Sequence, residues 1–220
     1  MQLTKHLQPW VIQESADAIT DLPTGSIRDG FGKALAELGA SNEAIVAVSA
    51  DLTESTRLNH FEKAFPKRFV QVGVAEQNLI GVSAGLALAG KIPFAASFAV
   101  FSPGRSWDQI RVSVCYSNLN VKIIGGHAGL TVGPDGATHQ ALEDIAMMRV
   151  LPNVIVVVPC DEYQTAAATR AIAEHVGPAY LRTSRATPTN ITTPETPFEI
   201  GKAQLLRDGS DITIIATGIM

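Results

Sequence analysis

Two short segments carry the residues best suited to chemistry, FVQVGVAEQN (69–78) and HAGLTVGPDGATHQ (127–140). In the first, a run of strand-forming residues stops at Glu76, and the apolar segment LIGVSAGLALAG follows. Burying a carboxylate costs several kcal/mol unless a partner compensates it. Glu76 either stabilises a helix start, where the macrodipole favours an acid by about 0.3–1 kcal/mol, or hydrogen-bonds a ligand. The segment alone leaves both interpretations open.

The second segment places His127, Asp135 and His139 around a glycine-rich loop. Glycine allows positive φ angles and close approach of the backbone to a ligand, and Thr138 can cap a helix that begins near His139. A surface loop with incidental histidines is the alternative. A zinc site is not expected, because Asp135 and His139 lie on opposite sides of a turn rather than on one helix face.

The elements that must position these residues alternate along the chain. Strands are expected at 44–52, 69–75, 92–98, 121–126, 154–160 and 179–184, and helices at 28–39, 60–65, 76–90, 105–117, 139–151 and 163–176. Nearly continuous apolar strands separated by helices predict an α/β fold, with a mostly parallel sheet and helices on both faces. Functional groups in such a sheet lie just beyond the carboxyl ends of the strands.

That rule brings further residues into the candidate site. Asp51 follows the first expected strand, and the aromatic pair Phe98 and Phe101 follows the third, although two phenylalanines three apart can also be core residues. Because parallel strands end at one edge, we expect these side chains to lie near Glu76 and His127.

The composition excludes several classes of protein. With 220 residues, a net charge of −4 and scattered basic residues, the chain suits one α/β domain with an appended segment and gives no reason to expect nucleic acid. Two cysteines favour a reduced compartment over a disulfide framework. The first twenty residues do not resemble a signal peptide, and no apolar run approaches the roughly 18 residues of a membrane span. A cytoplasmic protein is expected.

Taken in order, GVAEQN, SFAVF, HAGLTVGPDGATHQ and LPNVIVVVPCDEYQ resemble the pyrimidine-binding domain of thiamine-diphosphate enzymes of the transketolase group. The resemblance covers about residues 27–185 and is closest to split transketolases, whose C-terminal half is a separate chain. It divides the chain into an N-terminal extension (1–25), a pyrimidine-binding domain (26–186), a Thr- and Pro-rich linker (187–210) and the first strand of a truncated C-terminal domain (211–220).

The resemblance also implies roles for the candidate residues. Glu76 would hydrogen-bond the aminopyrimidine ring of thiamine diphosphate and favour its imino form, while Phe98 and Phe101 would hold that ring through contacts worth about 0.5–1.5 kcal/mol per aromatic pair. A third aromatic residue of larger transketolases falls at Gly104 here. Glu76 would be catalytic, together with two histidines.

Those histidines are His127 and His139, which with Asp135 match residues that hydrogen-bond the sugar. Arg28 and Arg185 match arginines that grip the sugar phosphate, a task suited to guanidinium groups.

Asp51 lies in the same loop as a family aspartate near the substrate channel, and is carried over as a substrate-binding candidate.

The GDG signature that binds magnesium and diphosphate in this family is missing from the sequence. The resemblance therefore implies that Mg²⁺ or Ca²⁺ is held by a partner, the N-terminal diphosphate-binding subunit of transketolase, and that this chain supplies no metal ligand. A homodimer or heterotetramer acting on sugar phosphates of the pentose phosphate type is expected.

Three alternatives remain open at this point. A 1-deoxyxylulose-5-phosphate synthase shares the DG-TH loop but usually has an arginine where HAGLTVGPDG has a histidine. A 2-oxoacid dehydrogenase β chain lacks the DGATHQ element. A scaffolding subunit with a decayed site is the non-enzyme hypothesis, and the retained Glu76, Phe98 and His127 argue against it.

Overall fold

The computed structural model describes residue 8 and residues 23–220. Its centre is a six-stranded sheet in the order β2-β1-β3-β4-β6-β5, with every neighbouring pair parallel. The strands are β1 (Ile45–Ser49), β2 (Phe69–Gln71), β3 (Ile92–Phe98), β4 (Lys122–Gly126), β5 (Ile155–Val157) and β6 (Ala179–Arg182). All their carboxyl ends therefore lie at one edge of the sheet.

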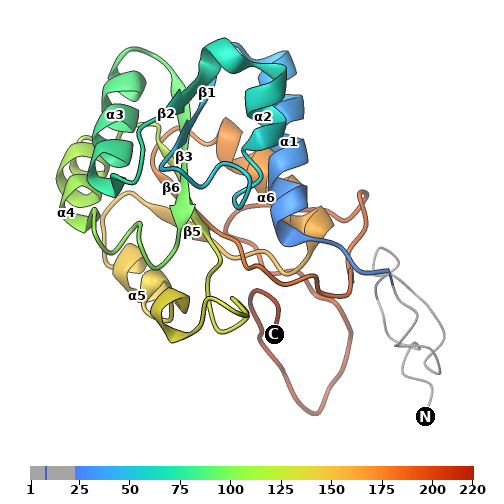
Figure 1. Cartoon of the computed structure of the whole chain (residues 1–220). Coiled ribbons are helices and arrows are strands. Elements are labelled where there is room, and N and C mark those ends of the chain that lie inside the picture. Colours follow the sequence, from blue (N-terminus) through green and yellow to red (C-terminus); the bar gives the residue numbers. More distant parts are fainter. Residues whose placement is uncertain (1–7, 9–22) are drawn as a thin grey trace.

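Helices cover both faces of this sheet (Figure 1). The main helices are α1 (Ile27–Ser41), α2 (Asn59–Ala64), α3 (Glu76–Leu88), α4 (Trp107–Gln109), α5 (Asp144–Arg149) and α6 (Glu162–Glu174). Two short 3₁₀ turns are η2 (Pro66–Arg68) and η4 (Ala137–His139), and a π-helical segment, η3 (Ile110–Tyr116), continues α4. Helices α1, α2 and α6 lie on one side of the sheet, and α3 and α4 lie on the other (Figure 1).

The pleat of the strands divides the core between the two faces. In β3, Phe94 and Ala96 pack with α1 and α6, whereas Ala95 between them packs with α3. The strands are buried on both faces, which is why their sequences read as continuous apolar runs instead of alternating ones. The predicted α/β class with helices on both faces is confirmed.

Local signals explain the ends of the two helices that contact each other most closely. Ser26 Oγ accepts a hydrogen bond from the Asp29 N–H at the start of α1, and Asp161 caps α6 by accepting from the Gln164 N–H. Gly30 allows this approach, since a side chain there would overlap the backbone of Glu162. The predicted helix boundaries in this region are correct to within one or two residues.

Helix α5 begins five residues later than predicted. Residues 140–143 form a loop, because Ala141 pairs with Ala128 in a parallel bridge that ties the loop to the end of β4. A helix starting at His139 would remove that bridge. The predicted helix over 105–117 forms only in part as α4, and its second half takes the wider π-helical turn of η3.

The C-terminal segment differs most from expectation. Residues 211–220 form no strand in this structure, and Ile212, Ile214 and Ile215 are exposed. Their assignment to a C-terminal domain stays a prediction. A strand requires a neighbour to complete its hydrogen bonds. In the described part of the chain, the backbone contact from this segment to the sheet is Gly218 N–H to Val158 O, 3.2 Å.

The first part of the predicted linker, residues 187–200, packs against the domain. Thr192 is buried, and both its N–H and its hydroxyl donate to the Asp161 carboxylate at 2.7 Å. Phe198 and Ile200 pack against the core beneath α1 and α6. Residues 187–200 therefore lie along the domain surface, whereas residues 201–210 are mostly exposed. Nearly all of the predicted N-terminal extension, 1–25, falls outside the described residues.

Across the ranges that the structure describes, no helix is both long enough and apolar enough to cross a membrane.

A buried polar cluster ties α5 to the sheet. The carboxylate oxygen Asp144 Oδ2 accepts hydrogen bonds from the Tyr180 hydroxyl at 2.7 Å and from Arg182 Nε at 2.8 Å. Burial, together with the Asp144 charge, raises the pKa of Tyr180 well above its usual value. Gly125 of the adjacent strand leaves room for the Tyr180 hydroxyl, since any side chain there would overlap it.

We expect Asp144→Asn to lower the free energy of unfolding by about 2–4 kcal/mol, because it leaves the partly buried Arg182 without its counter-charge. Asp108→Asn is a matched control: Asp108 pairs with Arg111 on the surface, and such pairs contribute about 0–1 kcal/mol. Urea unfolding followed by circular dichroism measures both. Equal losses in the two variants would contradict a special role for the buried cluster.

Candidate functional site

A pocket of about 350 Å³ opens at the carboxyl edge of the sheet. It is lined by Arg28, Leu52, Ser55, Phe98, His127, Asp135, His139 and Arg185. Six of the nine residues predicted from the sequence are in this list. They come from separate parts of the chain: the start of α1, the ends of β3 and β4, the loop after β4, and the segment after β6. The parallel sheet brings them together, as predicted.

His127 lies at the back of this pocket. Its ring is buried and stacks on Phe98 with centroids 3.8 Å apart and an interplanar angle of 28°. Burial, and then the nearby Arg28 and Arg185 charges, lower the pKa of His127 to about 4. Its Nδ1 atom is buried and has no hydrogen-bond partner among the described residues. His127 is therefore a neutral imidazole with one buried ring nitrogen that the described residues leave without a hydrogen bond.

His139 also lines the pocket and belongs to an aromatic cluster. The Phe98 and Phe101 rings stack with centroids 5.8 Å apart, and the His139 ring meets Phe101 edge-on at 5.2 Å. His139 Nδ1 is 2.8 Å from the Thr138 hydroxyl, which fixes the ring orientation. Thr138 thus orients His139 and does not cap a long helix.

Two arginines give the pocket its positive charge. Arg28 Nη1 donates to Ser55 O at 2.9 Å, and Arg185 Nη1 donates to Val132 O at 2.6 Å. The Arg28 Nε atom is buried and lacks a partner in the described part of the chain. Burial, followed by repulsion from Arg57 and Arg185, lowers the pKa of Arg28. An anionic group in the pocket would accept a hydrogen bond from Arg28 and offset the repulsion between the positive charges.

Asp135 is the acidic group of this pocket. Its Oδ2 atom lies 3.6 Å from Arg185 Nη1, and both side chains are partly exposed at the pocket mouth. One carboxylate facing two guanidinium groups leaves the lining with an excess of positive charge. The pocket therefore suits a polar ligand that carries an anionic group.

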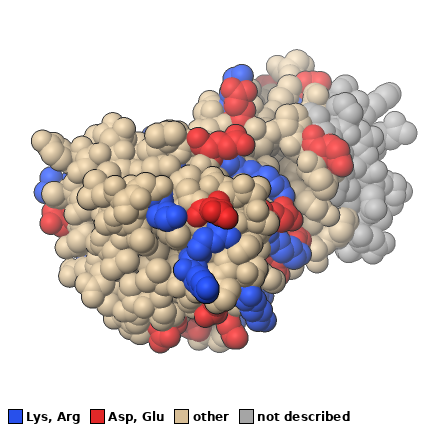
Figure 2. Space-filling model, turned by 90° about the horizontal axis from the view of Figure 1, so that it is seen from above, with Lys and Arg blue, Asp and Glu red and all other residues tan. Residues whose placement is uncertain are grey.

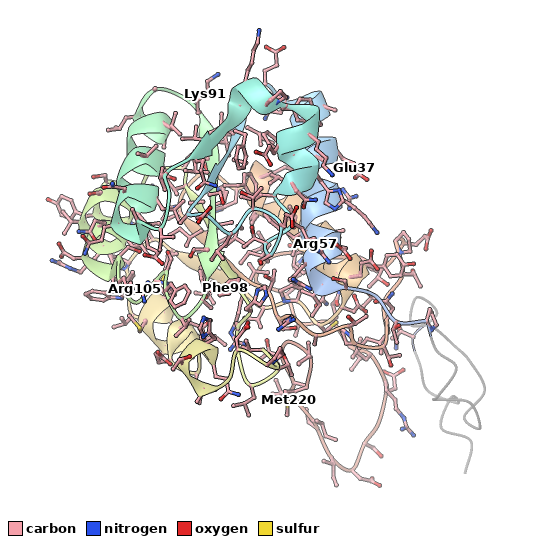
Figure 3. The ribbon with its side chains drawn as sticks, viewed as in Figure 1. Glu37, Arg57, Lys91, Phe98, Arg105 and Met220 are labelled. Atoms are coloured by element: carbon pink, nitrogen blue, oxygen red, sulfur yellow. The ribbon has the colours of Figure 1, made fainter. Side chains whose placement is uncertain are left out.

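Glu76 lies at the first residue of α3 and is 5% exposed. Its carboxylate has a compensating partner within the chain: Arg105 Nη1 donates to Oε1 at 3.0 Å. The Arg105 guanidinium also lies over the Phe101 ring, 4.4 Å from the centroid. Figure 3 shows Phe98 at the carboxyl end of β3 and Arg105 toward α4. Arg105 is a site residue that the sequence analysis missed, although the burial of Glu76 indicated that such a partner was needed.

Three predicted residues do not line the pocket. Phe101 adjoins it through Phe98 and His139, and Glu76 adjoins Phe101 through Arg105. These two form a second, neighbouring part of the site.

Asp51 is the third, and the structure separates it from the other candidates. Its side chain is exposed, and its backbone has φ 62° with the N–H donating to Gln71 Oε1 at 2.8 Å. Leu52 and Ser55 of the same loop line the pocket instead. Gly104, where a third aromatic was considered, follows Pro103 in the turn after Phe101 and has no ring to offer.

Within residue 8 and residues 23–220, no group of three or more His, Cys, Asp or Glu side chains is placed to hold a metal ion. A buried acid next to aromatic rings suits a flat nitrogen heterocycle, and the imidazoles and guanidinium groups suit the hydroxyl groups and the anionic group of a sugar phosphate.

Comparison with known proteins agrees with this geometry. Residues 24–189 match the family described as transketolase, pyrimidine binding domain. A protein assigned as a transketolase C-terminal section in Methanocaldococcus jannaschii is 53% identical over 194 residues, covering 87% of this chain and 61% of the relative. A 6-deoxy-6-sulfo-D-fructose transketolase subunit from Clostridium sp. is 44% identical, covering 88% of this chain and 60% of the relative.

A solved structure described as a split gene transketolase, inactive β4 tetramer, superposes with a TM-score of 0.81 at 50% identity, covering 90% of this chain and 64% of that chain. The chain spans about three-fifths of the length of the curated relatives it matches. The family match extends over well more than half of the present chain. The chain therefore belongs to the transketolase pyrimidine-binding domain family.

Proposed function

We propose that this chain is the C-terminal subunit, or part of it, of a split transketolase that transfers a two-carbon ketol unit between sugar phosphates. The observation that carries the proposal is the pocket at the sheet edge. There, His127 and Arg28 line a space together with Arg185 and His139, and each keeps a buried nitrogen, Nδ1 and Nε, that no described residue satisfies. These are donors and acceptors for hydroxyl groups and a phosphate, held beside the buried acid Glu76.

Enzymes of the transketolase group use thiamine diphosphate, and the residues around Glu76 fit its pyrimidine ring. Glu76 would share a proton with a ring nitrogen, and Phe98 and Phe101 would pack against the ring. When bound, the cofactor supplies the carbon nucleophile that protein side chains lack. Glu76 is only 5% exposed, so little water would compete with the ring for its carboxyl group.

The remaining residues would act on the sugar. His127, neutral because of its low pKa, can both accept and donate a hydrogen bond to hydroxyl groups. His139 and Asp135 would bind further hydroxyl or carbonyl oxygens, and Arg28 and Arg185 would hold the phosphate. Asp51 stays a candidate for the outer part of the substrate channel.

The diphosphate and its Mg²⁺ or Ca²⁺ would be bound by a second chain, the N-terminal subunit of transketolase. We propose that residues 26–186 form the pyrimidine-binding half of the joint site. Two or four chains would assemble as a homodimer or heterotetramer, and pentose phosphates are the substrate class we favour.

A largely uncharged surface is available for such assembly. Val74, Val82 and Leu88 are exposed on and beside α3. Viewed from above, charged side chains gather over the middle and right of the molecule, and the left, where α3 and α4 lie in Figure 1, is mostly uncharged (Figure 2). Exposed apolar area of this kind marks interaction surfaces. We propose that it contacts other subunits.

The direct test is turnover by the complex of this chain with a diphosphate-binding subunit. We expect Glu76→Gln to reduce ketol transfer by about 10²–10⁴-fold, because an amide cannot supply the proton. A coupled assay with a ketose-phosphate donor measures the rate, and pyruvate as donor tests the synthase and dehydrogenase alternatives. Glu174→Gln, at an exposed glutamate at the end of α6, is the control. Near-normal turnover by Glu76→Gln, or none by the wild-type complex, would refute the proposal.

The titration of His127 is a second test. Arg28→Gln should raise the pKa of His127 from about 4 toward its usual value of 6.5, because a repelling charge is removed. Imidazole NMR signals followed against pH measure this change. Arg170→Gln, which removes a surface arginine paired with Glu37, should leave the titration unchanged. An unaltered titration in Arg28→Gln would show that the arginine charge does not act on His127.

The lowered pKa of His127 also makes the stability of the folded chain depend on pH. The unfolded chain takes up a proton at this imidazole near pH 6.5, whereas the folded chain does so only near pH 4. The unfolded state therefore binds more protons between these values. The contribution of His127 to stability is complete above about pH 6.5 and is lost as the pH falls toward 4.

Cofactor binding by the isolated chain should be weak. Glu76, Phe98 and Phe101 can address only the pyrimidine, and charge-assisted contacts to the diphosphate would be the strong ones. Calorimetry with thiamine diphosphate and Mg²⁺ should therefore detect tight binding only after the diphosphate-binding subunit is added. Tight, magnesium-dependent binding by this chain alone would rule out a half-site.

A further inference from the structure

Arg105 makes two contacts that matter for the site. Its Nη1 atom donates to Glu76 Oε1 at 3.0 Å, and its guanidinium carbon lies 4.4 Å from the centroid of Phe101. The proposed function assigns the same carboxylate and an aromatic face of the same ring to the pyrimidine. One side chain of the protein therefore uses both groups that the cofactor needs.

The guanidinium group of Arg105 and the aminopyrimidine ring of the cofactor have similar chemistry. A guanidinium is planar, carries N–H donors in its plane and stacks on aromatic faces. An aminopyrimidine is also planar, offers nitrogen atoms to a carboxyl group and packs against aromatic rings. Two planar groups cannot occupy the same face of Phe101 and the same oxygen of Glu76 together.

The Arg105 side chain is free to leave these contacts, while its backbone is fixed. Its side chain is 56% exposed, against 6% for Glu76. The Arg105 N–H donates to Phe101 O at 2.8 Å, and its carbonyl accepts from Gln77 Nε2 at 3.1 Å. The guanidinium can therefore swing into solvent without moving the turn that carries Phe101 or the start of α3.

From this geometry we propose that Arg105 competes with the pyrimidine ring of the cofactor for Glu76 and Phe101, and so sets the affinity of the site for the cofactor. The inference rests on the proposed function. Before binding, the arginine compensates the buried carboxylate. On binding, the ring replaces the arginine, and the energy of the displaced ion pair and ring contact is subtracted from the cofactor affinity.

Removal of Arg105 should raise the cofactor affinity, because it destabilises the unbound state more than the bound state. Without Arg105, the unbound chain keeps a buried carboxylate that has lost its cation, and this destabilises the unbound state. The bound state loses little, since the ring has taken over both contacts. Because Arg105 is more than half exposed, solvent screens the ion pair and the gain is modest.

The test uses the complex of this chain with a diphosphate-binding subunit, titrated with thiamine diphosphate and Mg²⁺ by calorimetry. Arg105→Met should bind the cofactor about threefold to tenfold more tightly than the wild type. Arg105→Lys should lie between the two, because lysine keeps the charge but not the planar stack. In a Glu76→Gln background the gain from Arg105→Met should shrink, since the charge for which the arginine competes is gone.

Arg111→Met is the matched control. Arg111 belongs to the same segment, pairs with Asp108 at 3.1 Å and lies 6.0 Å from the Trp107 centroid, so it makes the same types of contact away from Glu76. Its removal should leave the affinity unchanged. Thermal unfolding of the chain without cofactor gives a second readout: Arg105→Met should lower the melting temperature more than Arg111→Met does.

The outcomes distinguish a failure of the proposed Arg105 competition from a failure of the proposed function. Weaker or unchanged cofactor binding by Arg105→Met, while the wild-type complex binds normally, would overturn the competition and leave the proposed function standing. A melting temperature equal to that of Arg111→Met would show that Arg105 does not compensate Glu76, which also overturns it. If neither the wild-type complex nor Arg111→Met binds thiamine diphosphate, the proposed function itself fails.

Discussion

The parallel direction of all six strands is the constraint on which the rest of this structure depends. Each connection must return along the sheet before the next strand can begin, and the returning segments are helices that cover both faces. Both faces are therefore buried, and the strands can carry almost no charge in their middles. Polar groups are placed where the strands end, and in this chain the ends of β3, β4 and β6 deliver Phe98, His127 and Arg185 to one pocket.

Polar residues buried near this edge are organised into two groups with different roles. In the cluster of Asp144, Tyr180 and Arg182, one carboxylate oxygen accepts two hydrogen bonds, and Arg182 holds the loop that carries His139 by also donating to Ala141 O at 3.1 Å. The pocket has fewer such bonds between its own side chains. His127 and Arg28 each keep a buried nitrogen that no described residue satisfies. A buried polar atom without a hydrogen bond is costly in a protein core, so such atoms at a pocket indicate a place where a ligand can bind.

The sequence predicted the architecture well because its signals were local and strong. The apolar run of β3 was placed to the residue, and the sheet-edge rule brought Phe98, His127, Asp135 and His139 to one pocket. Arg28 and Arg185 were placed there by the family resemblance. The late start of α5 could not be predicted, since it depends on the bridge between Ala128 and Ala141, a contact between distant parts of the chain. The strand expected at 211–220 does not form in this structure, where nearly all of these residues are exposed. Arg105 was missed because only the fold brings it to Glu76.

The backbone at His127 restricts how this pocket can change. Its φ of 56° lies in the left-handed region, which asparagine, aspartate, histidine and glycine tolerate but β-branched residues do not. Substitutions accepted at this position on conformational grounds are therefore polar or very small. Evolution can exchange the imidazole here for an amide or remove it, but valine or isoleucine would strain the main chain. The innermost wall of the pocket is thus biased by backbone geometry toward polar ligands, whatever the sugar it comes to accept.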